Sequence, residues 1–370
     1  MKNLFFYGSL QHQPLLEIVL NRPAAEIDMV PARLPDHAVH WVEDQPFPMI
    51  LSVPDQVAHG LLVRGLSAED IARIEFYEGG FDYALCTRQI ICEDVSSEQA
   101  EIFFPEATLW KPGAPWSLTD WVSEWGELSE YAAQEVMAFY GRRSPSEVAR
   151  SFPAIRMRAA ARIAAKARGT PQHRDVIVQS YTHAYQDYFA VDEMQVRHRR
   201  NDGDLTPLLN RSALMQGQAA VVLPYDPRRD CVLLVEQFRA PVYMIGDPAP
   251  WMWEPVAGMV DPGETPEQAA YREAREEAHI ELRALECAGQ AYSSSGSSTE
   301  FLHLYVGLAD LTETTQNGGL DSEGEDIRSA ILSFDELMAQ VDAHQVKDLP
   351  LLSIAHWLAR HRNRLRAGTS

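Results

Sequence analysis

The chain has 370 residues, of which 46% are hydrophobic, and carries a formal net charge of -21 at pH 7. This length exceeds one ordinary hydrophobic core, so two domains are expected. The acidic balance argues against nucleic-acid or anionic-membrane partners, and no apolar run is long enough to span a bilayer. Four scattered cysteines without metal-type spacing and the lack of a signal peptide predict a cytoplasmic protein.

The first part of the chain has the pattern of short strands around one capped helix. Strands are expected over residues 4–7, 57–63, 83–92 and 100–104. A helix capped at Ser67 is expected to run through Ile74 and to end within residues 76–80. The first strand ends in a sharp turn at Gly8 and Ser9, where exposed backbone amides can hold a carboxylate.

These elements resemble the gamma-glutamylcyclotransferase-like (AIG2-like) fold, a small mixed β-barrel. The resemblance is carried by Tyr7-Gly8-Ser9-Leu10, which matches the family's substrate loop, and by Glu78 in Tyr77-Glu78-Gly79, which matches its catalytic glutamate. It implies that the loop binds the substrate while Glu78 moves a proton. The substrate's amine then attacks its own gamma-amide carbonyl and forms 5-oxoproline. The alternative for Glu78 is a helix-end carboxylate without chemistry.

A helical connector is expected between the two domains. Residues 127–140 have a helical pattern that ends at Gly141, and Ser144 with Glu147 forms a capping box. That box opens an Arg- and Ala-rich helix predicted to run through Arg168. Four tryptophans between residues 110 and 125 are interpreted as core rather than as an interface. We therefore expect a first domain over 1–142, a helical linker over 143–175 and a second domain over 176–370.

The second domain alternates predicted strands with predicted helices. Two strands are expected over residues 176–198, a hairpin joins 219–224 to 231–235, and strands follow at 301–306 and 330–334. A glycine-punctuated loop leads into a central helix. This helix has Thr265 at its N-cap, Pro266 at its first position and Gln268 closing a capping box.

One face of the central helix carries three carboxylates, on Glu273, Glu276 and Glu277. Their mutual repulsion would be relieved by a hard divalent cation with oxygen ligands, such as Mg²⁺. A neighbouring stripe of small residues can pack closely on a sheet and consists of Ala270, Ala274 and Ala278. The alternative is a solvated acidic face.

This stretch resembles the Nudix box. The matching residues are Gly258, Glu264, Arg272, Glu273, Ala274, Glu276, Glu277 and Ile280. The departure is His279, where the family has a glycine that ends the helix in a left-handed conformation. The expected fold class is therefore α+β with two domains, a small mixed β-barrel followed by a Nudix α/β/α sandwich.

Residues 176–362 resemble the ADP-ribose pyrophosphatases within that superfamily, and more loosely the Nudix domain of tellurite-resistance-associated proteins. By position, the metal ligands fall on the carbonyl of Ala257 and on Glu273, Glu277 and Glu325. The implied catalytic residues are Glu276, Glu277, Glu323 and Glu325. The implied substrate contacts are Tyr188, Arg211, Arg239, Gly296 and Glu300. Tyr188 as core, Arg211 as a surface charge, and the loop glutamates as ordinary polar residues are the alternatives.

The resemblance implies Mg²⁺-dependent hydrolysis of ADP-ribose, or a related nucleoside-diphosphate sugar, to AMP and ribose 5-phosphate, with Mn²⁺ as the alternative metal. It also implies a homodimer, because these enzymes exchange their N-terminal strands. Two other functions stay open. One is a sensor that binds ADP-ribose without turnover, which the intact set of glutamates disfavours. The other is a bifunctional protein whose N-terminal domain acts on gamma-glutamyl compounds.

Overall fold

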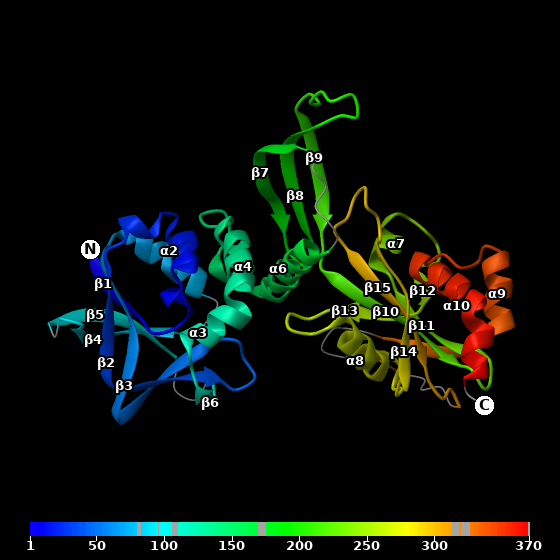
Figure 1. Cartoon of the computed structure of the whole chain (residues 1–370), viewed down its shortest axis with the longest axis horizontal. Helices are drawn as coiled ribbons and strands as arrows, with labels where there is room; N and C mark the ends of the chain where they lie inside the picture. Colours follow the sequence, from blue (N-terminus) through cyan, green and yellow to red (C-terminus); the bar gives the residue numbers. More distant parts are fainter. Residues whose placement is uncertain are drawn as a thin grey trace. The chain divides into compact units, whose positions relative to one another are not determined.

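The computed structural model describes residues 1–79, 83–94, 96–105, 110–168, 175–312, 318–319 and 326–368. They form two compact units (Figure 1). The first unit comprises residues 1–176, 181–190 and 198–204, and the second comprises 177–180, 191–197 and 205–370. The helices expected as a linker therefore belong to the first unit. No described helix is long and apolar enough to cross a membrane.

Among the described residues of the first unit, five strands close a mixed β-barrel, as predicted. They are β1 (Lys2–Phe6), β2 (Met29–Val42), β3 (Pro48–Leu66), β4 (Tyr83–Cys92) and β5 (Ser97–Pro105). The order is β3-β1-β5-β4-β2, and β2 pairs with β3 to complete the circle. β1 and β5 are parallel, and the other neighbouring pairs are antiparallel. A short strand, β6 (Pro112–Pro115), extends the sheet beside β2.

Helices cover part of the barrel and continue beyond it. They are α1 (Gln13–Leu20), α2 (Ala68–Glu78), α3 (Leu118–Trp121), α4 (Glu127–Met137), α5 (Pro145–Arg150) and α6 (Phe152–Ala167), with a π-helical turn at Val122–Gly126. α2 runs to Glu78, within residues 76–80 where the sequence predicted its end. The single long helix predicted from Ser144 was wrong, because α5 ends at Arg150 and α6 begins at Phe152. Pro153 has no N–H to continue α5 and lies in the first turn of α6. Of the tryptophans predicted as core, Trp121 is buried, and those at 110, 116 and 125 are partly exposed.

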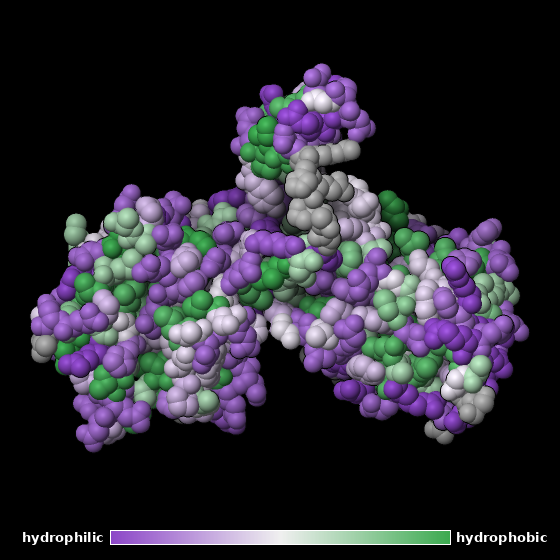
Figure 2. All heavy atoms as spheres, viewed as in Figure 1, coloured by the Kyte–Doolittle hydropathy of each residue, from purple (hydrophilic) through white to green (hydrophobic). Residues whose placement is uncertain are grey.

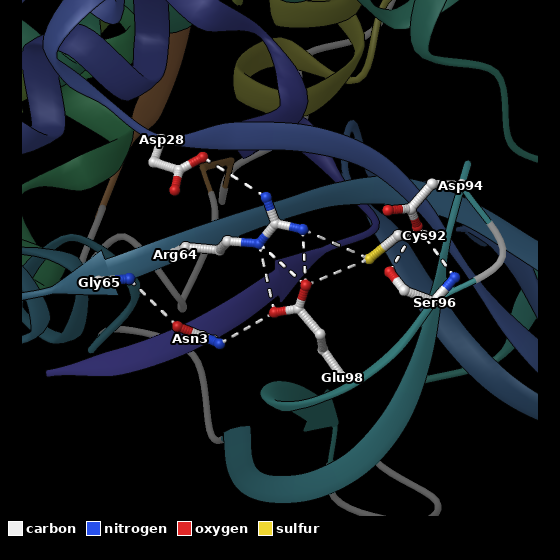
Figure 3. Close-up of polar contacts among 8 residues, drawn as sticks. All are labelled: Asn3, Asp28, Arg64, Gly65, Cys92, Asp94, Ser96 and Glu98. Carbon is white, nitrogen blue, oxygen red and sulfur yellow. Dashed lines mark hydrogen bonds and ion pairs between the residues drawn. The ribbon is translucent and has the colours of Figure 1, made fainter.

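A polar network ties four barrel strands together (Figure 3). The Arg64 guanidinium on β3 contacts Glu98 on β5 at 2.6 Å, and Cys92 on β4 lies 3.7 Å from the same carboxylate. Asn3 on β1 donates to Glu98 and accepts from the Gly65 amide. The hydrogen bond from Arg64 lowers the pKa of Glu98, so this carboxylate stays ionised under mildly acidic conditions.

The second unit is an α/β/α sandwich, as predicted. Its strands are β10 (Gln218–Asp226), β11 (Cys231–Phe238), β12 (Trp251–Glu254), β13 (Val256–Met259), β14 (Ala284–Tyr292), β15 (Phe301–Leu308) and β16 (Arg328–Ser333). The main order is β12-β11-β10-β15-β14, with β13 paired to β10 and β16 paired to β11. β10 and β15 are parallel. The helices are α7 (Ala240–Met244), α8 (Pro266–Ala278), α9 (Phe334–Asp342) and α10 (Leu349–Ala367).

Alternation along β10 explains why both faces of this sheet are covered. Val221 and Leu223 pack with α9 and α10, and Ala220 and Val222 pack with α8 on the other face. Figure 1 shows the helices on these two sides. Successive strand residues point to opposite faces of the sheet, so a strand made only of apolar residues is buried on both faces.

A separate sheet has the order β7-β8-β9 and contains residues assigned to both units. Its strands are β7 (Val176–Gln186), β8 (Ala190–His198) and β9 (Leu209–Met215). β7 and β8 are the two strands predicted over residues 176–198, and Tyr188 lies in the turn between them. On the visible face of the molecule, hydrophilic residues alternate with small hydrophobic patches (Figure 2).

Candidate active sites

The helix α8 positions the predicted acidic site. Its capping box is formed, because Thr265 and Gln268 exchange backbone and side-chain hydrogen bonds at 2.8 and 3.2 Å. The alanine stripe is buried against the sheet, so the acidic residues occupy another face. At the end of α8, His279 adopts φ 51° and ψ 37°. This histidine takes the left-handed conformation that the family's glycine supplies, at a cost of about 1 kcal/mol.

Arg272 joins the loop before α8 to the carboxylates on the helix. Its guanidinium contacts both oxygens of Glu264, at 3.1 and 3.0 Å, and donates to the Met259 carbonyl at 3.0 Å. It also contacts Glu273 at 2.6 Å and Glu276 at 3.0 Å. This forked set of contacts holds the loop and reduces the repulsion within the acidic face.

Two carboxylates converge on the backbone of β13. Glu277 is 3% exposed, and its Oε2 accepts a hydrogen bond from the Ala257 amide at 3.0 Å. The Glu273 carboxylate lies against Gly258, where an added Cβ would be 1.7 Å from Oε1. Gly258 therefore leaves the space that Glu273 occupies. Carboxylate and carbonyl oxygens are the ligands that a hard divalent cation prefers.

The described residues contain no group of three or more His, Cys, Asp or Glu side chains arranged to hold a metal. Arg272 instead pairs with Glu273 and Glu276. The predicted ligand Glu325 and the predicted catalytic residue Glu323 lie outside the described residues. The metal ligands thus stay a prediction, and the oxygen donors at β13 and α8 are chemically suited to it.

The described ends of the acidic loop lie at the last turn of α8. The Gly319 amide donates to the Glu276 carbonyl at 3.1 Å, and Gly318 pairs with Ile327. Gly318 packs so closely that an added Cβ would lie 1.8 Å from the Glu277 carbonyl oxygen. Both flanks of the loop are therefore anchored beside the acidic face.

Arg239 is held by a glutamate that the sequence interpretation missed. Its Nε lies 3.0 Å from both carboxylate oxygens of Glu254, which is 8% exposed. Asp348, at the N-cap of α10, is electrostatically coupled to this pair. The pKa of Asp348 is raised to about 6, mainly by burial and also by the charges of Glu254 and Glu300. The hydrogen bond from the Leu351 amide and the charge of Arg239 oppose this rise. The predicted residues Arg239 and Glu300 thus both lie within electrostatic reach of Asp348.

The other predicted substrate contacts are exposed. Tyr188 has 65% of its surface exposed, which excludes the core alternative, and its carbonyl accepts from Arg158 at 3.1 Å. It belongs to the first unit, whereas Arg211 and Gly296 belong to the second. Arg211 is exposed on β9 and donates to the Asn210 carbonyl, and Gly296 is exposed in the Ser-rich loop. The proposed roles of these residues stay predictions.

The first unit contains a cavity of about 340 Å³. Both parts of the predicted site line it, namely the loop Tyr7-Gly8-Ser9-Leu10 and Glu78 at the end of α2. Gly8 passes close to Pro48, since an added Cβ would lie 2.9 Å from the proline ring. The structure therefore brings together two segments that are far apart in the sequence.

The acid–base properties of this cavity follow from burial. Burial raises the pKa of Glu78 to about 7. Burial, and then the charge of Glu78, raise the pKa of Tyr7 well above its usual value, which indicates that the two groups are close. A carboxyl group that titrates near neutral pH can both accept and return a proton.

Comparisons with known proteins match each of the two units to a different family. The model of the "NUDIX domain" matches residues 215–352, and that of "Gamma-glutamyl cyclotransferase, AIG2-like" matches residues 4–123. An ADP-ribose pyrophosphatase of Escherichia coli (strain K12) is 33% identical over 192 residues, which cover 52% of this chain and 91% of that protein. An ADP-ribose pyrophosphatase of Haemophilus influenzae is 33% identical over 165 residues, which cover 44% of this chain and 76% of that protein. A GDP-mannose pyrophosphatase of Cronobacter sakazakii is 29% identical over 164 residues, which cover 44% of this chain and 84% of that protein. The chain therefore belongs to the Nudix family of pyrophosphohydrolases and carries an N-terminal AIG2-like domain.

Proposed function

We propose that the second unit hydrolyses the pyrophosphate bond of ADP-ribose, or of a related nucleoside-diphosphate sugar. For ADP-ribose the products are AMP and ribose 5-phosphate. The observation that supports this most strongly is the convergence of Glu273 and Glu277 on the backbone of Ala257 and Gly258. The named activities of the relatives agree with it.

Mg²⁺ is the proposed metal, with Mn²⁺ as the alternative. Glu273, Glu277, the Ala257 carbonyl and Glu325 would hold it. When bound, it supplies charge neutralisation and an activated water. Arg272 keeps the loop in register with the helix, and Glu276, with Glu323 and Glu325, provides the remaining catalytic carboxylates in this proposal.

Arg239 is proposed to bind a substrate phosphate. The Glu254 carboxylate fixes the guanidinium through Nε and Nη2, so Nη1 is oriented before substrate arrives. Tyr188 offers a flat face for the base, and Arg211, Gly296 and Glu300 are the other proposed contacts. Pre-orientation reduces the entropy lost on binding.

Product analysis tests the proposal. The purified protein should convert ADP-ribose to AMP with Mg²⁺ or Mn²⁺, and a parallel assay with GDP-mannose compares the two nucleotide classes. Binding of ADP-ribose without product under either metal would support the sensor alternative. Absence of AMP with every divalent metal tried would refute the proposed hydrolysis.

A second activity is proposed for the first unit, because Glu78 and the loop Tyr7-Gly8-Ser9-Leu10 line one cavity. A gamma-glutamyl compound would place its α-carboxylate on the loop and its α-amine near Glu78. The amine nitrogen bonds to the gamma-carbonyl carbon, the amide C–N bond breaks, and the proton lost by the amine passes through Glu78 to the leaving amine. The products are 5-oxoproline and a free amine. Glu78→Gln should abolish 5-oxoproline release, and an unchanged rate would contradict this role.

A cytoplasmic homodimer is the proposed state of the protein. β7 exposes hydrophobic side chains, among them Val176, Ile177 and Val178 at 63%, 48% and 50%. A second copy of the chain can cover these exposed side chains, and we propose an interface within residues 176–250. All four cysteines lie in the described residues and are free, which agrees with a reducing compartment. Light scattering at micromolar concentration should report a dimer, and a monomer would count against it.

A further inference from the structure

Part of the wall of the first unit's cavity lies outside the AIG2-like match. That match ends at residue 123. The wall continues with Trp125 and Ser129, and with Phe152, Pro153 and Arg156 of α6. The helical segment after the barrel is therefore a structural part of the cavity as well as a connection to the second unit.

A buried ion pair fixes these helices. Arg158 of α6 and Glu135 of α4 approach to 2.6 Å, and each side chain is 4% exposed. α4 and α6 also share a hydrophobic cluster that includes Val136 and Ile155. The wall is thus held by an ion pair and by packing within the unit.

The cavity has charged side chains on its barrel side and on its helical side. Among the described residues that line it, the two with charged side chains are Glu78 of the barrel domain and Arg156 of α6. The Arg156 guanidinium stacks on Trp125, with its Cζ 5.3 Å from the ring centroid. Burial and Glu78 raise the pKa of Tyr77, and Arg156 opposes that rise, so the Tyr77 hydroxyl lies within electrostatic reach of both charges.

We propose that Arg156, Trp125 and Phe152 form a specificity subsite for the leaving half of the ligand. The inference rests on the cyclotransferase activity proposed for this unit. The leaving half is an α-amino acid with an apolar, preferably aromatic, side chain. Its carboxylate pairs with Arg156, and its side chain packs against Trp125 and Phe152. The barrel loop and Glu78 hold the gamma-glutamyl half.

A matched pair of probes tests the subsite in the full-length protein. L-γ-glutamyl-L-phenylalanine and L-γ-glutamyl-2-phenylethylamine differ only in the carboxylate that Arg156 would bind. The kcat/KM for 5-oxoproline release should favour the first by at least about tenfold, which corresponds to ~1.4 kcal/mol. Arg156→Gln should reduce this preference to within about twofold. Arg150→Gln removes the same charge from exposed α5, outside the cavity lining, and should keep it.

The outcomes separate the subsite from the activity on which it rests. Equal rates for the two amides in the wild-type protein, or an unchanged preference in Arg156→Gln, overturn the subsite and leave the cyclotransferase proposal standing. If neither amide yields 5-oxoproline, the activity proposal fails, and calorimetric Kd values for the intact amides decide the subsite. A tenfold preference lost in Arg156→Gln supports it, and absence of binding by both amides overturns it. If Arg156→Gln does not fold, Arg156→Lys must keep a preference for the carboxylate-bearing amide, and its loss overturns the subsite.

Discussion

Gly258→Ala tests whether the position of the Glu273 carboxylate matters for turnover. The added Cβ would lie 1.7 Å from Glu273 Oε1, whereas real Cβ contacts are essentially never under 3.0 Å. The carboxylate must therefore move by at least 1.3 Å (3.0 minus 1.7). A displacement of about 1 Å costs roughly 100-fold in rate, or ~2.7 kcal/mol. We expect kcat/KM for ADP-ribose to fall by about that factor, with a higher Mg²⁺ concentration for half-maximal rate.

Gly289→Ala in β14 is the matched control, because no heavy atom lies within 4 Å of its added Cβ. Steady-state AMP release should be measured for both variants across a Mg²⁺ titration, and thermal unfolding should show that both fold. The control is expected to behave like the wild type. A folded Gly258→Ala protein with wild-type kcat/KM and metal dependence would refute the assignment of Glu273 to the metal site.

Four further predictions concern Glu277, Glu78 and the buried pair Arg158–Glu135. Glu277→Gln should lower turnover by roughly 2.7–4 kcal/mol of transition-state stabilisation; a near-normal rate at saturating metal would show that Glu277 is not a ligand. 5-Oxoproline release should rise as pH passes through about 7, where Glu78 loses its proton; a flat profile would exclude Glu78 as the base. Folding raises the pKa of Glu78 from 4.5 to about 7. The protonated carboxyl therefore contributes fully to the stability of the folded state below pH 4.5, and this contribution is lost as the pH rises through about 7. Glu78→Gln should therefore raise the unfolding temperature more at about pH 8.5 than at about pH 5.5, and an equal change would contradict burial of the carboxylate. Arg158→Met should cost about 3–5 kcal/mol in urea unfolding by leaving Glu135 buried without its partner, and the double variant with Glu135→Leu should recover most of it; a small loss in the single variant would argue against a buried pair.

Features determined by neighbouring residues were predictable from the sequence. The start of α8 follows from Thr265 and Gln268, which interact across three residues, and its buried face follows from the four-residue spacing of the alanines. The break between α5 and α6 was missed, although Pro153 marks it. A capping box at Ser144 predicts where a helix begins, but it contains no information on where the helix ends.

Contacts between distant residues were not predictable from local pattern. Glu254 lies 15 residues from Arg239, and their ion pair depends on the alignment of β11 with β12. Asp348 comes after all the strands of the sheet in the sequence, and its electrostatic coupling to that ion pair depends on where α10 begins. Similarly, Arg156 has the sequence context of a solvated helix and reaches the cavity only because α6 packs beside the barrel domain. Motif resemblance located the predicted residues, while tertiary packing selects the groups that support them.

The interleaved division of the chain limits how its two parts can be exchanged in evolution or in the laboratory. The boundary between the units falls after residues 176, 180, 190, 197 and 204. One cut after residue 176 would leave residues 181–190 on the fragment of the second unit, although this segment includes Tyr188, whose carbonyl is bound by Arg158. The first unit therefore cannot be exchanged as one continuous segment of the chain. Its duplication, deletion or transfer to another protein must either include strands β7 and β8 or leave Arg158 without that contact.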